Sequence, residues 1–407
     1  MAGPLTGYRV LDMSRVLAGP WAGQLLADLG ADVIKVERPK VGDDTRHWGP
    51  PYLKDATGAD TEDAAYFFSA NRGKRSLTVD ITQPEGQDII RKLASKVDVL
   101  IENYKVGGLA KYGLDYSSLE KLNPKLVYCS ITGFGQTGPY AQRPGYDFLI
   151  QGMAGLMSVT GEPDSQNGGG PTKVGVAVTD IFTGLYAANA IQGALLERHH
   201  SGIGQYIDLA LLDVQAAVMA NQASNYLIGG QIPGRLGNAH PNIVPYQAFA
   251  TLDSHVIVAV GNDQQFQRFC KAIGEPKWAD DQRYATNTAR VNNRVTLCGQ
   301  ITKHLKQQTS QYWLSKFEDH AVPCGPINTI DQVFDDPQIQ SRNMVLTMQD
   351  PRAGELKLVA NPINYSRSQI EYHLAPPQLG NQTIEILQEY LEYAETTVKV
   401  LESNDVI

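Results

Sequence analysis

Short apolar runs and amphipathic segments alternate along the first half of the chain. Each apolar run predicts a buried strand, and the segments between them carry apolar residues at helical spacing. This alternation is typical of a parallel α/β sheet with helices packed on its faces. The expected strands are Tyr8–Asp12, Asp32–Val36, Ser76–Ile81, Val97–Glu102, Leu126–Ile131 and Tyr206–Leu209, and the expected helices are Ala18–Leu29, Pro84–Ser95 and Tyr116–Leu122.

The middle of the chain is richer in helical pattern. After it comes an irregular stretch, Gly229–Pro245, whose glycines and prolines indicate a linker or binding loop. A hairpin at 247–260 and helical segments to about Phe317 then predict a smaller α+β domain. The expected helices before the loop are Tyr146–Ser158, Ile181–Arg198 and Leu212–Leu227.

Length and composition narrow the classes of protein. A chain of 407 residues is too long for one ordinary core, so two domains are expected. Hydrophobic residues make up 42% and charged residues 19%, which is typical of a globular protein. The formal net charge of −8 argues against general binding to nucleic acid or to an anionic membrane.

Cysteine usage and the chain start indicate a cytoplasmic protein. The cysteines are scattered and form no CxxC pair, so neither a disulfide framework nor a thiolate zinc site is expected. The start lacks a secretory pattern, and no apolar run reaches the length of about 18 residues that a membrane span needs. The four cysteines are Cys129, Cys270, Cys298 and Cys324.

Several common catalytic motifs are missing. The first predicted strand is followed by Ser14–Pro20 rather than GxGxxG, which disfavours a dinucleotide dehydrogenase. Gly73-Lys74 resembles part of a phosphate loop, but Phe68 stands where the upstream glycine should be. Histidines do not occur at metal-ligand spacing, and no GxSxG elbow is present.

Basic residues gather after the early strands, where parallel sheets bind ligands. A phosphorylated, anionic ligand would suit these charges as a group, but each one alone is better explained as a solvated surface charge. The residues are Arg15, Arg38, Arg46, Arg72, Lys74 and Arg75.

Asp180 begins a long predicted helix. Local physics predicts that it is the N-cap, since aspartate is favoured there. A functional role is compatible with that position. The helix dipole stabilises a carboxylate as the anion, and only the anion is a nucleophile.

Motifs along nearly the whole chain resemble the class III (family III) CoA-transferases. Within the family, the chain is most similar to the succinyl-CoA:glutarate and acetyl-CoA:oxalate branches. The matching motifs are 7–12, 18–20, 29–37, 42–46, 71–76, 102–104, 130–139, 173–186, 235–241 and 322–326.

The resemblance implies a fold and an assembly. A large Rossmann-like domain is expected to begin in residues 1–225 and to be completed by a returning C-terminal segment, 329–407. Residues 226–246 would form a linker or active-site loop, and 247–328 the small α+β domain. Two subunits are expected to interlock like chain links as a homodimer.

The resemblance also implies roles for single residues. Asp180 aligns with the family's nucleophile, and CoA enters as a substrate, with no permanently bound cofactor and no metal. The residues implied in CoA binding are Val16, Arg38, Val79, Asn103, Tyr104, Lys111, Gly133, Phe134 and Gly135. From their chemistry rather than from the resemblance, the candidates for contacting the carboxylic acid that accepts CoA are Arg46, Tyr146, Arg235, Asn238 and His240. An arginine fork could hold a second carboxylate, and the alternative for the arginines, Asn238 and His240 is ordinary loop structure or a contact to CoA.

The function expected from these residues is transfer of CoA from an acyl-CoA, such as succinyl-CoA, to a small dicarboxylate through aspartyl anhydride and aspartyl-CoA intermediates. One alternative is the α-methylacyl-CoA racemase branch, which carries a histidine base where this chain has Tyr146. Tyrosine ordinarily has a pKa of about 10, which makes it a poor base near neutrality. A second alternative is a non-catalytic CoA-binding protein.

Overall fold

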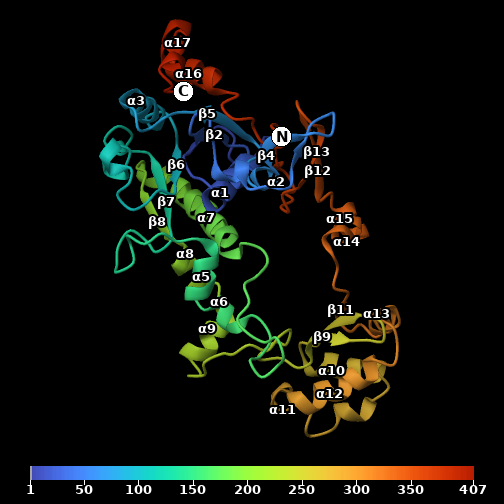
Figure 1. Cartoon of the computed structure of the whole chain (residues 1–407). Coiled ribbons are helices and arrows are strands. Elements are labelled where there is room, and N and C mark those ends of the chain that lie inside the picture. Colours follow the sequence, from blue (N-terminus) through green and yellow to red (C-terminus); the bar gives the residue numbers. More distant parts are fainter. Residues whose placement is uncertain (1) are drawn as a thin grey trace. The chain divides into compact units, whose positions relative to one another are not determined.

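The computed structural model describes residues 2–407, which fold into two units (Figure 1). The larger unit comprises the residues up to Leu156 together with Val174–Ser224 and Pro337–Ile407. The smaller unit comprises Met157–Lys173 and Asn225–Asp336. The chain therefore leaves the larger unit twice and returns to it twice.

A parallel sheet forms the centre of the larger unit, as the apolar runs predict. Every neighbouring pair of strands in it is parallel. The first strand lies beside the fourth, so the chain's direction of winding reverses between β1 and β6, where such sheets bind ligands. In spatial order the strands are β5 (Lys74–Thr78), β2 (Asp32–Glu37), β1 (Arg9–Asp12), β6 (Val99–Glu102), β7 (Val127–Thr132) and β8 (Tyr206–Ala210).

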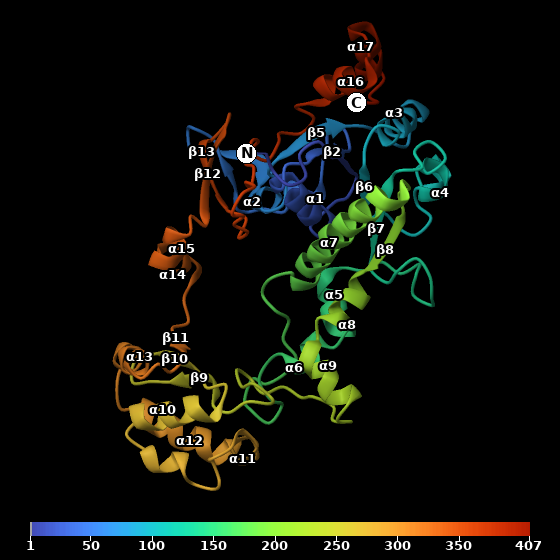
Figure 2. The same ribbon diagram turned by 180° about the vertical axis from the view of Figure 1, so that it is seen from behind.

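Helices cover both faces of this sheet (Figure 2). On one face, α1 (Ala18–Asp28) packs against α7 (Val178–Ser201). Gly184 allows that contact, because a Cβ there would lie 2.7 Å from the Ala18 carbonyl oxygen and 2.9 Å from the Cβ of Trp21. On the other face lie α3 (Pro84–Ala94), α16 (Thr383–Leu391) and α17 (Glu395–Ser403).

Two antiparallel hairpins of the larger unit were not predicted. They are β3–β4 and β12–β13, whose strands are short or polar and so give little apolar periodicity. The remaining elements of this unit are η1 (Asp44–His47), β3 (Tyr52–Lys54), β4 (Asp60–Ala64), α2 (Ala65–Phe68), η2 (Ala110–Tyr112), α4 (Tyr116–Leu119), α5 (Asp147–Met153), α8 (Leu211–Ala217), α15 (Pro337–Ser341), β12 (Val345–Asp350) and β13 (Gly354–Val359).

The smaller unit has its own apolar core and a three-stranded antiparallel sheet. The predicted hairpin is present, with His255 opposite Ala250. The irregular stretch before it contains no helix or strand over residues 228–245. The elements are β9 (Tyr246–Ala250), β10 (His255–Ala259), α10 (Asp263–Ala272), η3 (Pro276–Ala279), α11 (Asn287–Asn292), α12 (Arg294–Leu305), α13 (Ser310–Asp319), β11 (Cys324–Gly325) and α14 (Ile330–Asp335).

Two predicted helices are each broken into two. The helix expected at 146–158 is divided into α5 and α6 (Leu156–Val159) by Gly155, whose φ is +87°. The helix expected at 212–227 is divided into α8 and α9 (Ala220–Leu227), and Ala220 has a φ of +45°. A residue in the left-handed conformation interrupts the hydrogen bonds of a helix. The apolar periodicity does not report this interruption, so the predicted helices extend past the real helix ends.

Residues 2–407 include no helix that combines the length and the apolar character needed to cross a membrane. All four cysteines are free thiols.

Candidate active site

A strained turn follows β1 at the reversal point of the sheet. Val16 has a φ of +72°, a conformation that is costly for a β-branched residue and is typical of functional sites. Asn103, just after β6, holds this turn from the side. Its Oδ1 accepts from the Arg15 N–H (2.9 Å), and its Nδ2 donates to the Arg15 carbonyl (2.7 Å). Both polar groups of the Asn103 side chain are therefore engaged with the turn.

Asp43 also holds the turn after β1 in place. Its carboxylate accepts the Val16 N–H at 3.3 Å and a bond from the Lys35 ammonium at 2.8 Å, and both charged side chains are fully buried. Burial raises the pKa of Asp43, but the Lys35 charge and hydrogen bonds from Lys35 and Thr45 outweigh it and lower the pKa to about 2. Asp43 is therefore a fixed anion that orients the strained backbone.

The other residues implied in CoA binding follow the carboxyl ends of the strands. Arg38 is exposed beyond β2. Burial raises the pKa of Asp80 after β5, but hydrogen bonds from Thr82 and Gln83 and, as the smallest cause, the Arg38 charge lower it. Val79 is buried. The Arg15 guanidinium lies 6.0 Å from the centre of the Tyr104 ring, and the Lys111 ammonium lies 4.5 Å from that of Tyr112.

The turn after β7 positions the start of α5. A Cβ at Gly133 would lie 2.6 Å from the Cα of Gly145, so these two glycines bring the segments together. Phe134 is buried, and the Gly135 N–H donates to Thr132 Oγ1 at 2.9 Å. The close approach fixes the segment that continues into Tyr146 and Asp147.

The predicted capping role of Asp180 is wrong. Helix α7 begins at Val178 after Ala177, so Asp180 lies in its first turn rather than at the cap. Asp147, from α5, takes the capping role instead. Its Oδ2 accepts the N–H groups of Thr179 (2.8 Å) and Asp180 (3.2 Å), and its Oδ1 accepts from Gln151 (2.6 Å). These bonds satisfy helix N–H groups that otherwise lack partners.

The carboxyl group of Asp180 has an unusual environment. Burial, followed by the negative charge of Asp147, raises its pKa to about 7. Both effects disfavour the anion, because burial removes hydration and Asp147 is a like charge. A carboxyl group that titrates near neutrality is typical of a functional site.

Tyr66 and Trp48 belong to this neighbourhood, although the sequence analysis did not identify them. Burial, followed by the charges of Asp180 and Asp147, raises the pKa of Tyr66 to about 12. The Trp48 ring packs edge-on against Tyr66 with a centroid distance of 5.3 Å. These residues carry no spacing signal, because Trp48 directly follows η1 and Tyr66 lies in the short helix α2. For Asp147, an acidic residue at the start of a predicted helix was an available signal.

Arg46 does not suit the expected contact with an acceptor acid. Its side chain is 2% exposed and pairs with Glu37 and Asp63 at 2.8 Å each, with Phe67 against its guanidinium. These core partners already pair with its charge, so the buried Arg46 side chain is not placed to contact an acceptor acid. Tyr146, in contrast, is 65% exposed beside Asp147.

The other expected acceptor contacts lie in the smaller unit. Arg235 forms an ion pair with Asp164, and its Nε donates to the Glu162 carbonyl at 3.1 Å. His240 Nδ1 accepts the Asn242 N–H at 3.1 Å, and burial followed by the Arg294 charge lowers the pKa of His240. Asn238 is exposed. Asp147, Tyr66 and Asp180 therefore lie in one cluster in the larger unit, whereas Arg235, Asn238 and His240 lie in the smaller unit.

Throughout residues 2–407, no three His, Cys, Asp or Glu side chains are grouped so as to hold a metal ion. The Asp180 carboxyl stands out on its own evidence, because it lies in the first turn of α7 beside the carboxylate of Asp147 and its pKa is raised.

Comparison with known proteins identifies relatives over almost the full length. The family model described as CoA-transferase family III matches residues 5–383. The succinate–glutarate CoA-transferase of Agrobacterium fabrum is 54% identical over 394 residues, which cover 97% of each chain. The human succinyl-CoA:glutarate CoA-transferase is 43% identical over 404 residues, 99% of this chain and 90% of that protein.

A solved structure is similar in fold as well. The crystal structure of a CAIB/BAIF family protein from Brucella suis superimposes with a TM-score of 0.83 at 49% identity. The match covers 96% of this chain and all of the other.

Proposed function

The chain belongs to CoA-transferase family III, and from this premise we propose that it moves CoA from succinyl-CoA to a small dicarboxylic acid such as glutarate, with Asp180 as the nucleophile. The observation that carries the proposal is the Asp180 carboxyl itself, in the first turn of α7 with its pKa raised to about 7. Relatives that share 43–54% identity are named for transfer between succinate and glutarate, which supports the choice of substrates.

The first half of the reaction transfers CoA to the enzyme. An Asp180 carboxylate oxygen attacks the thioester carbonyl carbon of the donor, the C–S bond breaks, and CoA leaves as the thiolate. The product is a mixed aspartyl–acyl anhydride. The thiolate then attacks the aspartyl carbonyl carbon, the anhydride C–O bond breaks, and the donor acid leaves as a carboxylate. Covalent catalysis divides one difficult exchange into easier steps.

The second half repeats these steps with the acceptor. The acceptor carboxylate attacks the aspartyl-CoA thioester and releases CoA thiolate, which leaves a second mixed anhydride. The thiolate attacks the acceptor's acyl carbon, which yields the new acyl-CoA and restores the Asp180 carboxylate. No net proton transfer is needed in either half.

Stabilisation of the oxyanions that form in these steps requires hydrogen-bond donors. The N–H groups of Thr179 and Asp180 already donate to Asp147, so they do not serve this purpose. We assign the role to the Tyr66 hydroxyl, because burial, followed by the charges of nearby carboxylates, raises its pKa and keeps it a protonated donor.

The turn after β1 is the proposed binding site for CoA. Val16 and Asn103 shape its backbone, and Arg38 and Lys111 supply exposed positive charge for phosphate groups. Contacts from Val79, Tyr104 and the Gly133–Gly135 turn are proposed on the same basis. Arg235, Asn238 and His240 remain the proposed contacts for the second carboxylate of the acceptor, with Tyr146 beside the nucleophile.

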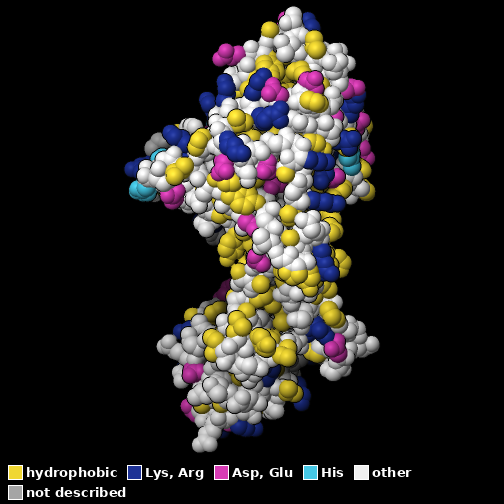
Figure 3. Space-filling view, turned by 90° about the vertical axis from the view of Figure 1, so that its left-hand side faces the viewer, with side chains coloured by type: hydrophobic (Ala, Val, Ile, Leu, Met, Phe, Trp, Pro, Cys, Tyr) yellow, Lys and Arg dark blue, Asp and Glu magenta, His cyan; other side chains and the backbone are white. Residues whose placement is uncertain are grey.

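The interlocked homodimer is proposed as the assembly. Hydrophobic side chains lie exposed among charged ones on the face drawn in Figure 3. Exposed apolar surface of this kind marks interfaces. Near Asp180, the exposed apolar side chains include Phe148, Leu149 and Met153 of α5 and Phe182, Leu185 and Tyr186 of α7. A monomeric mass by sedimentation equilibrium at micromolar protein would contradict the proposal.

The function is tested by assaying the protein with succinyl-CoA and a panel of acids that includes glutarate, oxalate and monocarboxylates. Transfer to a dicarboxylate, lost in Asp180→Asn, is the expected outcome. Appreciable transfer by the variant would rule out Asp180 as nucleophile. Deuterium uptake at the α-carbon of a 2-methylacyl-CoA, without transfer, would favour the racemase reaction instead.

A further inference from the structure

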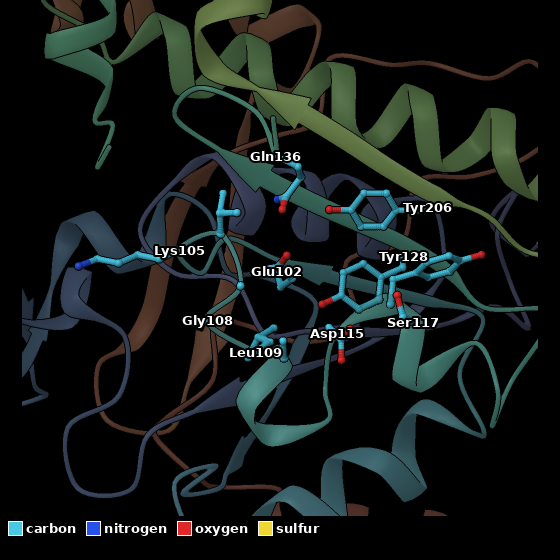
Figure 4. A pocket seen from close by; sticks show the side chains of 13 residues that line it. Glu102, Lys105, Gly108, Leu109, Asp115, Ser117, Tyr128, Gln136 and Tyr206 are labelled. Carbon is cyan, nitrogen blue, oxygen red and sulfur yellow. The ribbon is translucent and has the colours of Figure 1, made fainter. Parts of the chain in front are cut away.

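A cavity of about 380 Å³ lies over β6, β7 and β8, in the range of small-molecule sites (Figure 4). The segment from Lys105 to Ala110 forms one wall. The lining contains neither Asp180 nor the proposed CoA contacts Asn103, Tyr104 and Lys111. The transferase reaction therefore leaves this cavity without an assigned role.

Three tyrosines form an aromatic wall of the cavity. The centroids of Tyr116, Tyr128 and Tyr206 lie 5.3–5.9 Å apart, so their rings pack as one cluster. The Tyr128 hydroxyl donates to the Leu114 carbonyl at 3.1 Å, which fixes its ring. Aromatic faces of this kind attract cations through the ring quadrupole.

Glu102 is the charged group at the centre of the cavity (Figure 4). It is 6% exposed, and its hydrogen bonds come from neutral donors, the Tyr104 N–H at 2.7 Å and Ser130. Gln136 donates to Ser130 Oγ at 2.9 Å and holds that partner in place. Burial is the main cause that raises the pKa of Glu102 to about 7.

The charge of the lining is negative. Asp115 adds a second carboxylate, and the Lys105 side chain extends away from the other labelled groups (Figure 4). An anionic ligand such as an acyl-CoA or a dicarboxylate would meet two carboxyl groups here. A cation would instead keep Glu102 ionised and satisfy it.

We propose that this cavity binds a small organic ammonium cation, held by Glu102 and Asp115 and by the tyrosine faces. The lining residues are not among the proposed CoA contacts, and the proposal does not depend on the proposed substrates. Because Glu102 must be ionised in the complex, binding near pH 7 releases a proton from the fraction of molecules in which Glu102 is protonated.

Isothermal titration calorimetry of the full-length protein with ethylammonium and with choline tests the proposal. At least one of the two cations is expected to bind, and the heat at pH 7 should vary with the ionisation enthalpy of the buffer. Glu102→Gln should weaken binding by about tenfold or more, because a charge-assisted bond is lost. Asp115→Asn, which removes the second carboxylate but keeps the side-chain oxygen that accepts from Ser118 Oγ at 2.6 Å, should weaken binding less.

Glu85→Gln, an exposed carboxylate on α3, is the matched control and should bind like the wild type. Thermal unfolding of each variant establishes that it is folded. Absence of binding by both cations, or equal binding by Glu102→Gln, would overturn the proposal. Preferential binding of succinate to the cavity would overturn it as well.

Discussion

The raised pKa of Asp180 makes the pH dependence of transfer a direct test of the site. Because only the carboxylate attacks, kcat/KM should rise with pH through about 7, where the free enzyme's Asp180 ionises. A rise from the usual value of 3.8 to about 7 is about 3 pH units. At about 1.4 kcal/mol per unit, the site disfavours the anion by roughly 4 kcal/mol.

The perturbation that separates the two causes is Asp147→Asn. Burial is the larger cause of the raised pKa and the Asp147 charge is the smaller, so Asp147 accounts for less than half of the rise. Removing its charge should therefore move the acid limb of the kcat/KM profile to lower pH by about one unit. The plateau rate should also fall, since asparagine cannot accept both the α7 N–H groups and the Gln151 amide as well as a carboxylate does.

The assay is initial-rate transfer from succinyl-CoA at low substrate concentration, measured from about pH 5 to about pH 9 so that the range brackets the pKa of about 7. Asp213→Asn, an exposed aspartate in the first turn of α8, is the control and should leave the profile unchanged. A wild-type acid limb near the ordinary aspartate pKa would refute the reasoning. So would an Asp147→Asn profile that coincides with the wild type.

Two further predictions concern stability. The pKa of Asp180 in the folded protein lies above its value in the unfolded chain, so the folded protein loses stability as the pH rises from about 4 to about 7. Asp180→Asn removes this loss, so the variant should be more stable than the wild type at about pH 8, by at most about 4 kcal/mol, and little changed at about pH 4. Urea unfolding at the two pH values measures the difference. Gly184→Ala should destabilise the protein by about 1–3 kcal/mol and reduce transfer, because its Cβ would press α1 and α7 apart. Gly193→Ala in the same helix is the control, because a Cβ at Gly193 would have no atom within 4 Å and should stabilise the protein by up to about 1 kcal/mol. Equal effects of the two substitutions on the unfolding midpoint would contradict the close packing of α1 and α7.

The central sheet could be predicted because burial on both faces leaves each strand as a continuous apolar run. Leu126–Ile131, for example, differs from β7 by one residue at each end. The β12–β13 hairpin could not be predicted in this way, since its strands are largely exposed and alternate weakly. Helix ends at Gly155 and Ala220 depend on backbone conformations that apolar periodicity does not report.

The residues of the candidate site could also be predicted only in part. Asp180 was identified through its family motif, whereas local capping preference gave the wrong position for it in the helix. That preference considers only neighbouring residues, and the actual cap is Asp147, 33 positions away in the chain. Arg46 was misjudged because sequence does not reveal that Glu37 and Asp63 surround a basic side chain.

The most direct test of the account is mass spectrometry of the protein after incubation with succinyl-CoA in the absence of an acceptor. The account predicts a covalent CoA thioester on the peptide that contains Asp180, which hydroxylamine converts to a hydroxamate and which Asp180→Asn lacks. An adduct on another residue, or CoA exchange between acids by Asp180→Asn, would contradict it.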